Sequence, residues 1–219
     1  VAKTREQNRT NTIPTPFFRC INVLARGLAG KKYKLKMDRK PLLMDADGYG
    51  NKEAMMDYVM TWTLKHAAEK FENEKPILNK YCREVLFHLL GINDFEKIKV
   101  KEVTTRLQRF GADVTAEITL ENEAEESRYA LLIEDKAYTS LHDDQLARYK
   151  KIFEEYYNGS SYELRYAVVV LPDTMPEATK EESKRNGFEP FCLGDLPLSD
   201  WQEESESDLF NEFWLRYWG

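Results

Sequence analysis

The hydrophobic pattern is clearest over residues 76–90, where apolar side chains recur at steps of three and four. That spacing places them on one face of a helix. Pro76 suits the first turn of a helix, and Gly91 is a natural stop. The sequence therefore predicts a helix over 76–90. Further helices are expected over 14–28, 52–71, 143–157 and 205–217.

A second pattern, with a period of two, predicts strands. Residues 97–104 alternate between apolar side chains and lysines, as expected of a half-exposed strand. The alternation slips at Glu102 and Val103, where a bulge or the end of the strand is expected. Residues 129–136 and 164–171 carry longer apolar runs that indicate burial on both faces. The remaining predicted strands are 112–120 and a short one at 187–194.

The order of these elements predicts an α/β fold with a mixed central sheet flanked by helices. Three strands follow one another as a meander, and a helix then leads to the strand at 164–171. Because that connection is a helical crossover, strand 164–171 is expected to run parallel to strand 129–136. Residues 1–75 are predicted to form a mainly helical N-terminal extension, and residues 76–219 the main domain.

Composition and charge narrow the class of protein. The chain has 219 residues, of which 42% are hydrophobic, and this suffices for a sizeable core. Its formal net charge of −6 argues against a protein that coats nucleic acid through bulk positive charge, but it permits an enzyme with a local basic groove. The three cysteines are too widely spaced for a zinc site or a disulfide framework, which favours a cytoplasmic protein. No apolar run approaches the length of a membrane span, and no signal peptide is visible.

Three ionisable residues end the apolar strand at 129–136, where Leu-Leu-Ile runs directly into Glu134, Asp135 and Lys136. Ionisable groups at the end of a buried run cost free energy unless they are paired or hold a metal. Because strand side chains alternate between faces, Glu134 and Lys136 share one face and Asp135 points to the other. We therefore interpret Asp135 as a surface charge.

A second carboxylate is expected beside this strand end. Antiparallel pairing across the turn at 121–127 joins residues whose numbers sum to about 248, which sets Asp113 beside Glu134 and Lys136. Two ionised carboxylates at such a short distance repel each other, and a hard divalent cation bound between them relieves the repulsion. We expect Asp113 and Glu134 to hold Mg²⁺, with Mn²⁺ as a substitute. Lys136 would then orient the attacking water or stabilise developing negative charge during metal-assisted phosphodiester hydrolysis.

The same residues resemble the motif of the PD-(D/E)xK nuclease superfamily. Asp113 matches the motif's Asp, and Glu134 and Lys136 match its Glu-x-Lys. Gln145 and Tyr149 match a Q-x-x-x-Y motif that some branches carry on the next helix. The segments that carry the resemblance are GAD at 111–113, IEDK at 133–136 and DQLARY at 144–149.

The resemblance covers roughly residues 76–195 and implies a restriction-endonuclease-like fold with an αβββαβ core. It also implies dependence on Mg²⁺ and cleavage of DNA, with Gln145 and Tyr149 supporting the catalytic site. The sequence departs from the motif at Ala112, where the superfamily name indicates proline. In some members a helix glutamate completes the metal shell, and Glu74 and Glu84 are the candidates here.

A basic stretch at 30–40 is the best candidate for contact with nucleic acid outside the motif. Lys31, Lys32, Lys34 and Lys36 are suited to phosphates, and they equally suit a solvated face of the protein. Both interpretations stay open.

Two classes of function remain after these observations. The favoured one is a metal-dependent nuclease, with DNA favoured over RNA as substrate, either free-standing or within a defence or restriction system. The alternative is a nuclease-fold module that binds nucleic acid or protein without cleaving. A homodimer and a partner subunit of a defence system are both compatible with the sequence.

Overall fold

The computed structural model describes residues 52–136, 141, 144–170, 174–192, 195 and 203–215. All structural statements below refer to these residues. The predicted helix at 14–28 and the basic stretch at 30–40 lie outside them.

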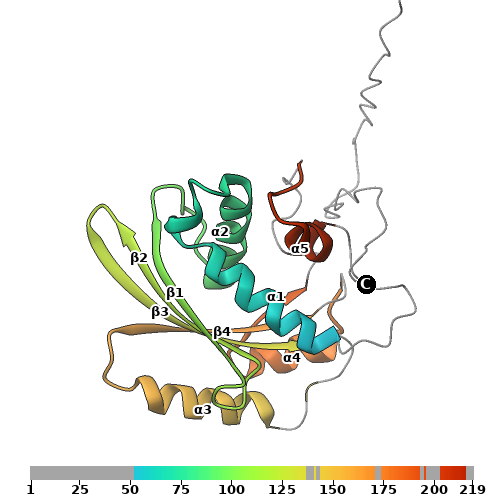
Figure 1. The fold of residues 1–219 in the computed structure, drawn as a ribbon. Helices are drawn as coiled ribbons and strands as arrows, with labels where there is room; N and C mark the ends of the chain where they lie inside the picture. The colour runs from blue at the N-terminus through green and yellow to red at the C-terminus, as the bar shows by residue number, and fades with distance from the viewer. Residues whose placement is uncertain are drawn as a thin grey trace, which may run out of the picture. The chain divides into compact units, whose positions relative to one another are not determined.

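The core of the fold is a five-stranded mixed sheet in the order β1-β2-β3-β4-β5 (Figure 1). The first three strands form an antiparallel meander, and the last two run parallel to the third. This confirms the predicted α/β fold, including the parallel strand after the helical crossover. The strands are β1 (Lys99–Leu107), β2 (Val114–Asn122), β3 (Glu125–Lys136), β4 (Tyr162–Val170) and β5 (Glu189–Cys192).

Helices cover both faces of the sheet, and each face has its own hydrophobic core. Figure 1 shows α1, α2 and α5 on one face and α3 and α4 on the other. None of the described helices has the length and apolar character needed to cross a bilayer. The helices are α1 (Lys52–His66), η1 (Glu69–Phe71), α2 (Pro76–Leu90), α3 (Gln145–Tyr157), α4 (Glu177–Arg185), α5 (Asp208–Phe210) and the π-helical η4 (Asn211–Leu215).

Helix α2 has the predicted bounds, because its apolar stripe is buried against the sheet. Leu78, Cys82, Val85 and Leu86 are all fully buried. Gly91 follows the helix with a φ of +71°, a left-handed conformation that glycine adopts at little cost. The periodicity and the stop signal therefore agree, and the element was predictable from sequence.

Helix α1 ends at His66, five residues earlier than the sequence predicts, and a side chain from α2 explains why. The amide of Asn79 donates to the backbone carbonyls of His66 and Ala68, at 2.7 and 2.9 Å. These carbonyls are therefore satisfied without further helical turns. Met56 and Met60 of α1 lie in the same core as α2 and the sheet. Helix α1 thus contributes to this core from the N-terminal side of the predicted boundary at residue 75.

The β2–β3 hairpin turns at Glu123 and Ala124, which both have positive φ angles. This two-residue turn pairs Val114 with Ile133, so paired residue numbers sum to 247 rather than 248. Continued by one residue, the register sets Asp113 against Glu134. The predicted irregularity in β1 is also present, as a register shift between Val100 and Glu102.

Two helical segments differ from the sequence prediction. Helix α4 was missed because its sequence is almost entirely polar and buries only Ser183, so it has no apolar stripe. The C-terminal helix begins at Asp208 instead of 205, because Ser207 caps it by accepting the N–H of Phe210 at 3.3 Å.

The N-terminus of α2 is capped by a carboxylate from a distant part of the chain. Glu206 accepts the backbone N–H groups of Ile77 and Leu78, at 3.2 and 2.8 Å. Burial would raise the pKa of Glu206, but the N–H groups outweigh it and lower the pKa below its usual value. A carboxylate also opposes the positive end of the helix dipole.

We expect Glu206→Gln to destabilise the protein by about 1 kcal/mol at neutral pH, since a charged cap is replaced by a neutral one. Because the folded pKa is lowered, this contribution is present above the unfolded pKa and disappears as the pH falls through the folded pKa. Chemical denaturation of the wild type and the variant at pH 7 and at pH 3 measures the destabilisation and its dependence on pH. Glu125→Gln, on an exposed strand residue, serves as the control. An equal effect of both substitutions at pH 7 would contradict the capping role.

Candidate functional site

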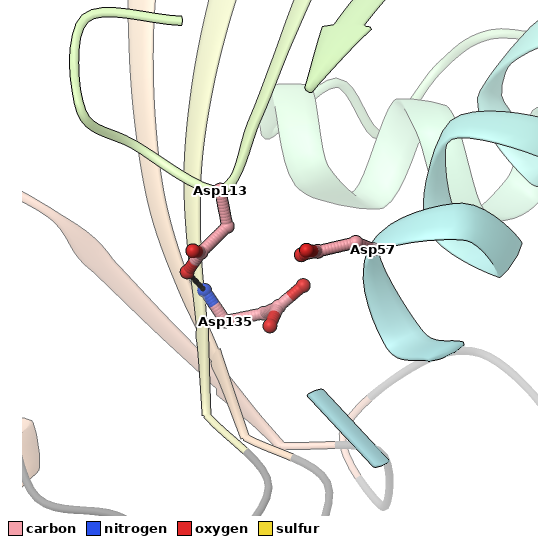
Figure 2. A group of neighbouring side chains, drawn as sticks. All are labelled: Asp57, Asp113 and Asp135. Atoms are coloured by element: carbon pink, nitrogen blue, oxygen red, sulfur yellow. Dashed lines mark hydrogen bonds between the residues drawn. The ribbon is translucent and has the colours of Figure 1, made fainter. Parts of the chain in front are cut away.

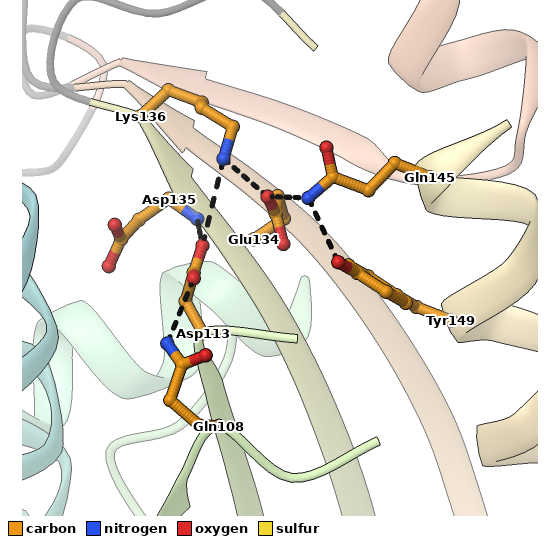
Figure 3. Close-up of polar contacts among 7 residues, drawn as sticks. All are labelled: Gln108, Asp113, Glu134, Asp135, Lys136, Gln145 and Tyr149. Atoms are coloured by element: carbon orange, nitrogen blue, oxygen red, sulfur yellow. Dashed lines mark hydrogen bonds and ion pairs between the residues drawn. The ribbon is translucent and has the colours of Figure 1, made fainter. Parts of the chain in front are cut away.

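Polar side chains from three elements meet at the C-terminal end of β3 (Figure 3). Glu134, Asp135 and Lys136 are all buried there, with exposed fractions of 0%, 1% and 9%. The strand is internal to the sheet, with β2 on one side and β4 on the other, and this position buries its end. Charges at such depth require compensation from neighbouring groups or from a bound ion.

Asp113 reaches this strand end from the turn that connects β1 and β2. Its Oδ2 accepts the backbone N–H of Asp135 at 2.9 Å and lies 3.9 Å from the ammonium of Lys136. Its Oδ1 accepts the side-chain amide of Gln108 at 3.2 Å. The turn that delivers Asp113 includes Gln108, Phe110 and Gly111, all with positive φ. These turn residues explain why β2 begins at Val114 and not at the predicted residue 112.

Glu134 presents its two carboxylate oxygens to different surroundings. Oε1 accepts hydrogen bonds from the ammonium of Lys136 and, at 2.6 Å, from the amide of Gln145. Oε2 is buried and has no hydrogen-bond partner among the described residues. Burial, followed by the negative charge of Asp113, raises the pKa of Glu134 to about 7, although Lys136 acts in the opposite direction. A cation at Oε2 would satisfy this oxygen and favour the ionised form.

Helix α3 supplies a polar pair to the same face of the sheet. Gln145 and Tyr149 lie one turn apart, and the Gln145 amide donates to the Tyr149 hydroxyl at 3.2 Å. Gln145 therefore links Tyr149 to Glu134. The ring of Tyr149 lies against Gly111, so α3 is also packed on the turn that carries Asp113.

The opposite face of the sheet holds a second group of carboxylates (Figure 2). Asp135 points toward Asp57 of α1, and oxygens of Asp57, Asp113 and Asp135 lie within 4.8 Å of one another. Burial, and then the neighbouring Asp57, raises the pKa of Asp135 well above its usual range. The prediction that Asp135 faces away from Glu134 has the right strand phase, but its interpretation as a surface charge is wrong, because α1 covers it.

The structure brings together all five residues that the sequence selected for the site. Glu134, Lys136, Gln145 and Tyr149 are linked by hydrogen bonds, and Asp113 lies within ion-pair distance of Lys136. Their roles in metal binding and catalysis remain a prediction. Lys31, Lys32, Lys34 and Lys36 lie outside the described residues.

Asp57 is the residue that the sequence analysis missed. Among the described residues, one group of three or more His, Cys, Asp or Glu side chains is placed to share a cation. It consists of Asp57, Asp113 and Asp135, and neither Glu74 nor Glu84 belongs to it. The available signal was the position of Asp57 beside Met56 on the buried side of α1. An acid among core residues of a helix needs a partner across the fold.

Carboxylates gathered at the end of a central strand are suited to hold a divalent metal ion, which in hydrolases polarises phosphoryl oxygens. The family model of the PD-(D/E)XK nuclease superfamily matches residues 42–212, and the chain belongs to this superfamily. The superfamily consists mainly of nucleases that use divalent metals and act on nucleic acids, and it includes non-catalytic members. The match begins before α1 and therefore includes Asp57. No curated protein and no solved structure matches the chain.

The contact between Gly111 and Tyr149 generates a prediction about the rigidity of the site. Gly111 has a φ of +87°, and a Cβ placed on it would lie 2.5 Å from Cε1 of Tyr149. Gly111→Ala should therefore strain the left-handed backbone at residue 111 and also press the added Cβ against the ring of Tyr149. Gly159→Ala is the matched control, since Gly159 has a φ of +75° but nothing within 4 Å of the added Cβ.

We expect Gly159→Ala to cost about 1 kcal/mol of unfolding free energy for the left-handed conformation alone, and Gly111→Ala to cost clearly more. In a Tyr149→Ala background, the cost of Gly111→Ala should fall to that of the control. Denaturant unfolding of the wild type and these variants measures the costs. Equal costs for the two alanine substitutions in the wild-type background would show that Tyr149 is free to move aside.

Proposed function

We propose that the protein is a Mg²⁺-dependent nuclease that hydrolyses phosphodiester bonds in DNA, with Asp113 and Glu134 as metal ligands and Lys136 as a catalytic residue. The observation that carries the proposal is the different use of the two oxygens of Glu134. One carboxylate oxygen accepts from both Lys136 and Gln145, while the other is buried without a hydrogen-bond partner among the described residues. Such an orphaned oxygen beside a second carboxylate fits a hard cation.

The residues of this face suit magnesium better than a softer metal. The two proposed ligands, Asp113 and Glu134, both offer carboxylate oxygens, which suit a hard cation better than a soft one. Mg²⁺ is commonly held by one or two carboxylates together with phosphate oxygens. When bound, the ion supplies Lewis-acid polarisation of the scissile phosphate. Mn²⁺, which accepts the same ligands, is the expected substitute.

We assign to Lys136 the stabilisation of the negative charge that develops during phosphodiester hydrolysis. Its ammonium contacts the carboxylate of Glu134 and lies 3.9 Å from that of Asp113, so it is held beside both carboxylates. Its side chain is 11% exposed, so it is largely shielded from bulk water. A preorganised donor in such surroundings stabilises transition-state charge more than it stabilises bound substrate.

Gln145 and Tyr149 act as positioning residues. Gln145 donates to the Glu134 oxygen that Lys136 also contacts, so Glu134 is held in one orientation with its other oxygen turned away. Tyr149 braces Gln145 through its hydroxyl and lies against the turn that carries Asp113. The pair therefore connects the two proposed metal ligands through α3.

Lys136→Ala separates an enzyme from a binding module. We expect this variant to bind DNA in Ca²⁺ nearly as tightly as the wild type but to cleave about a hundredfold more slowly, or slower still, in Mg²⁺, since one preorganised donor is removed. Lys151→Ala, on an exposed part of α3, is the control. The measurements are DNA affinity in Ca²⁺ and single-turnover cleavage in Mg²⁺. If the wild type cuts neither DNA nor RNA with any divalent metal, and Lys136→Ala only weakens binding, the protein is a non-cleaving module.

The basic stretch at 30–40 supplies a test of the substrate. If Lys31, Lys32, Lys34 and Lys36 bind phosphates, replacing all four by serine should weaken binding equally for different DNA sequences. The slope of log affinity against log salt should fall by about 0.9 for each duplex-DNA phosphate that the variant no longer neutralises. A slope that does not change would identify this stretch as a solvated face. Parallel titrations with RNA of the same sequence measure the preference between the two substrates.

A further inference from the structure

The carboxylates on the α1 face of the sheet have no role in the proposed hydrolysis beyond that of Asp113. Asp57 comes from α1, Asp135 from the end of β3 and Asp113 from the β1–β2 turn, and Figure 2 shows their side chains converging. Strand alternation directs Asp135 away from Glu134 and Lys136, so the lysine of the proposed catalytic site does not serve Asp135.

Asp135 is the carboxylate of this group whose burial most needs compensation. It is 1% exposed, and neither of its carboxylate oxygens has a hydrogen-bond partner among the described residues. Its backbone N–H, in contrast, donates to Asp113. A carboxylate buried in this way loses its hydration without receiving donors in return, and this destabilises the folded state unless a proton or a cation compensates.

Two kinds of compensation fit the geometry. A shared proton would join Asp57 and Asp135 as an acid pair and would leave Asp113 uninvolved. A divalent cation would engage all three residues, because oxygens from all three lie within 4.8 Å of one another. Asp113 is only partly buried, so the group is open to an ion on its side. The convergence of the third carboxylate favours the cation.

We propose that Asp57, Asp113 and Asp135 form a second site for a hard divalent cation, on the α1 face of the sheet, which fastens α1 to the end of β3. The site shares Asp113 with the proposed catalytic metal and is otherwise built from different residues. It exists whether or not the Glu134 face binds a metal. Its oxygen-only ligands suit Mg²⁺, Mn²⁺ or Ca²⁺.

The test is a cation count on the full chain in the absence of nucleic acid. Mn²⁺ is titrated into the protein and the free ion is followed by its electron paramagnetic resonance signal, while thermal unfolding is recorded with and without Mn²⁺. The variants are Asp135→Asn and Asp57→Asn for the α1 face and Glu134→Gln for the opposite face. Asp94→Asn, on an exposed residue outside both groups, is the control.

We expect the wild type to bind two Mn²⁺ ions, and Asp135→Asn and Asp57→Asn each to bind one. Both α1-face variants should also lose most of the rise in melting temperature that Mn²⁺ gives the wild type. Glu134→Gln should lose the other ion and keep that rise, because α1 is still fastened. If Asp135→Asn does not fold, Asp57→Asn supplies the same comparison from the other side of the site.

The outcomes distinguish this proposal from the proposed nuclease site. One ion that disappears in Glu134→Gln but stays in both α1-face variants would overturn the second site and leave the catalytic metal in place. One ion that disappears only in the α1-face variants would support the second site and contradict the ligand role of Glu134. A wild type that binds no Mn²⁺, with a melting temperature that Mn²⁺ does not change, would overturn both and identify Asp57 and Asp135 as a proton-sharing pair.

Discussion

The arrangement of the site depends on one constraint, which is that β3 carries Glu134 and Asp135 as consecutive residues while both of its faces are covered. Alternation sends one carboxylate to each face, and neither is accessible to bulk water. Compensation is therefore needed on both faces. On one face Lys136 and Gln145 donate to Glu134. On the other face Asp135 meets a further acid, Asp57, so its compensation has to come from a proton or a cation.

Asp113 connects the two faces. It lies just before β2 and receives the backbone N–H of Asp135, so it occupies the level of the sheet itself. The β1–β2 turn places it there through residues in left-handed conformations, of which Gly111 also makes room for the ring of Tyr149. Displacing this turn would therefore disturb both Asp113 and the Gln145–Tyr149 pair of α3.

The sequence was sufficient wherever a pattern is local. The apolar stripe of α2, the alternating strands and the Glu-x-Lys spacing all follow from neighbouring residues. The predicted register of the β2–β3 hairpin was wrong by one residue, because the two-residue turn that begins at Glu123 was not identified. The sequence was insufficient where the cause lies across the fold. Asn79 ends α1, and Asp57 meets Asp135 only because helix and strand pack together. Burial of the Asp135 side chain likewise depends on α1, which covers its face of the sheet, in addition to the internal position of β3.

The carboxylate of Asp113 accepts the backbone N–H of Asp135, and this hydrogen bond extends the pairing of β2 with β3 at its end. Under the proposed function, Asp113 meets two separate requirements, one for charge at the metal and one for an acceptor of a backbone hydrogen bond. A lineage that abandoned cleavage would be released from the first but not from the second. Drift at this position should therefore run toward asparagine, which keeps an acceptor oxygen, while alanine would let the end of the strand fray. A relative with asparagine here would have given up the chemistry of the site while keeping the sheet that carries it.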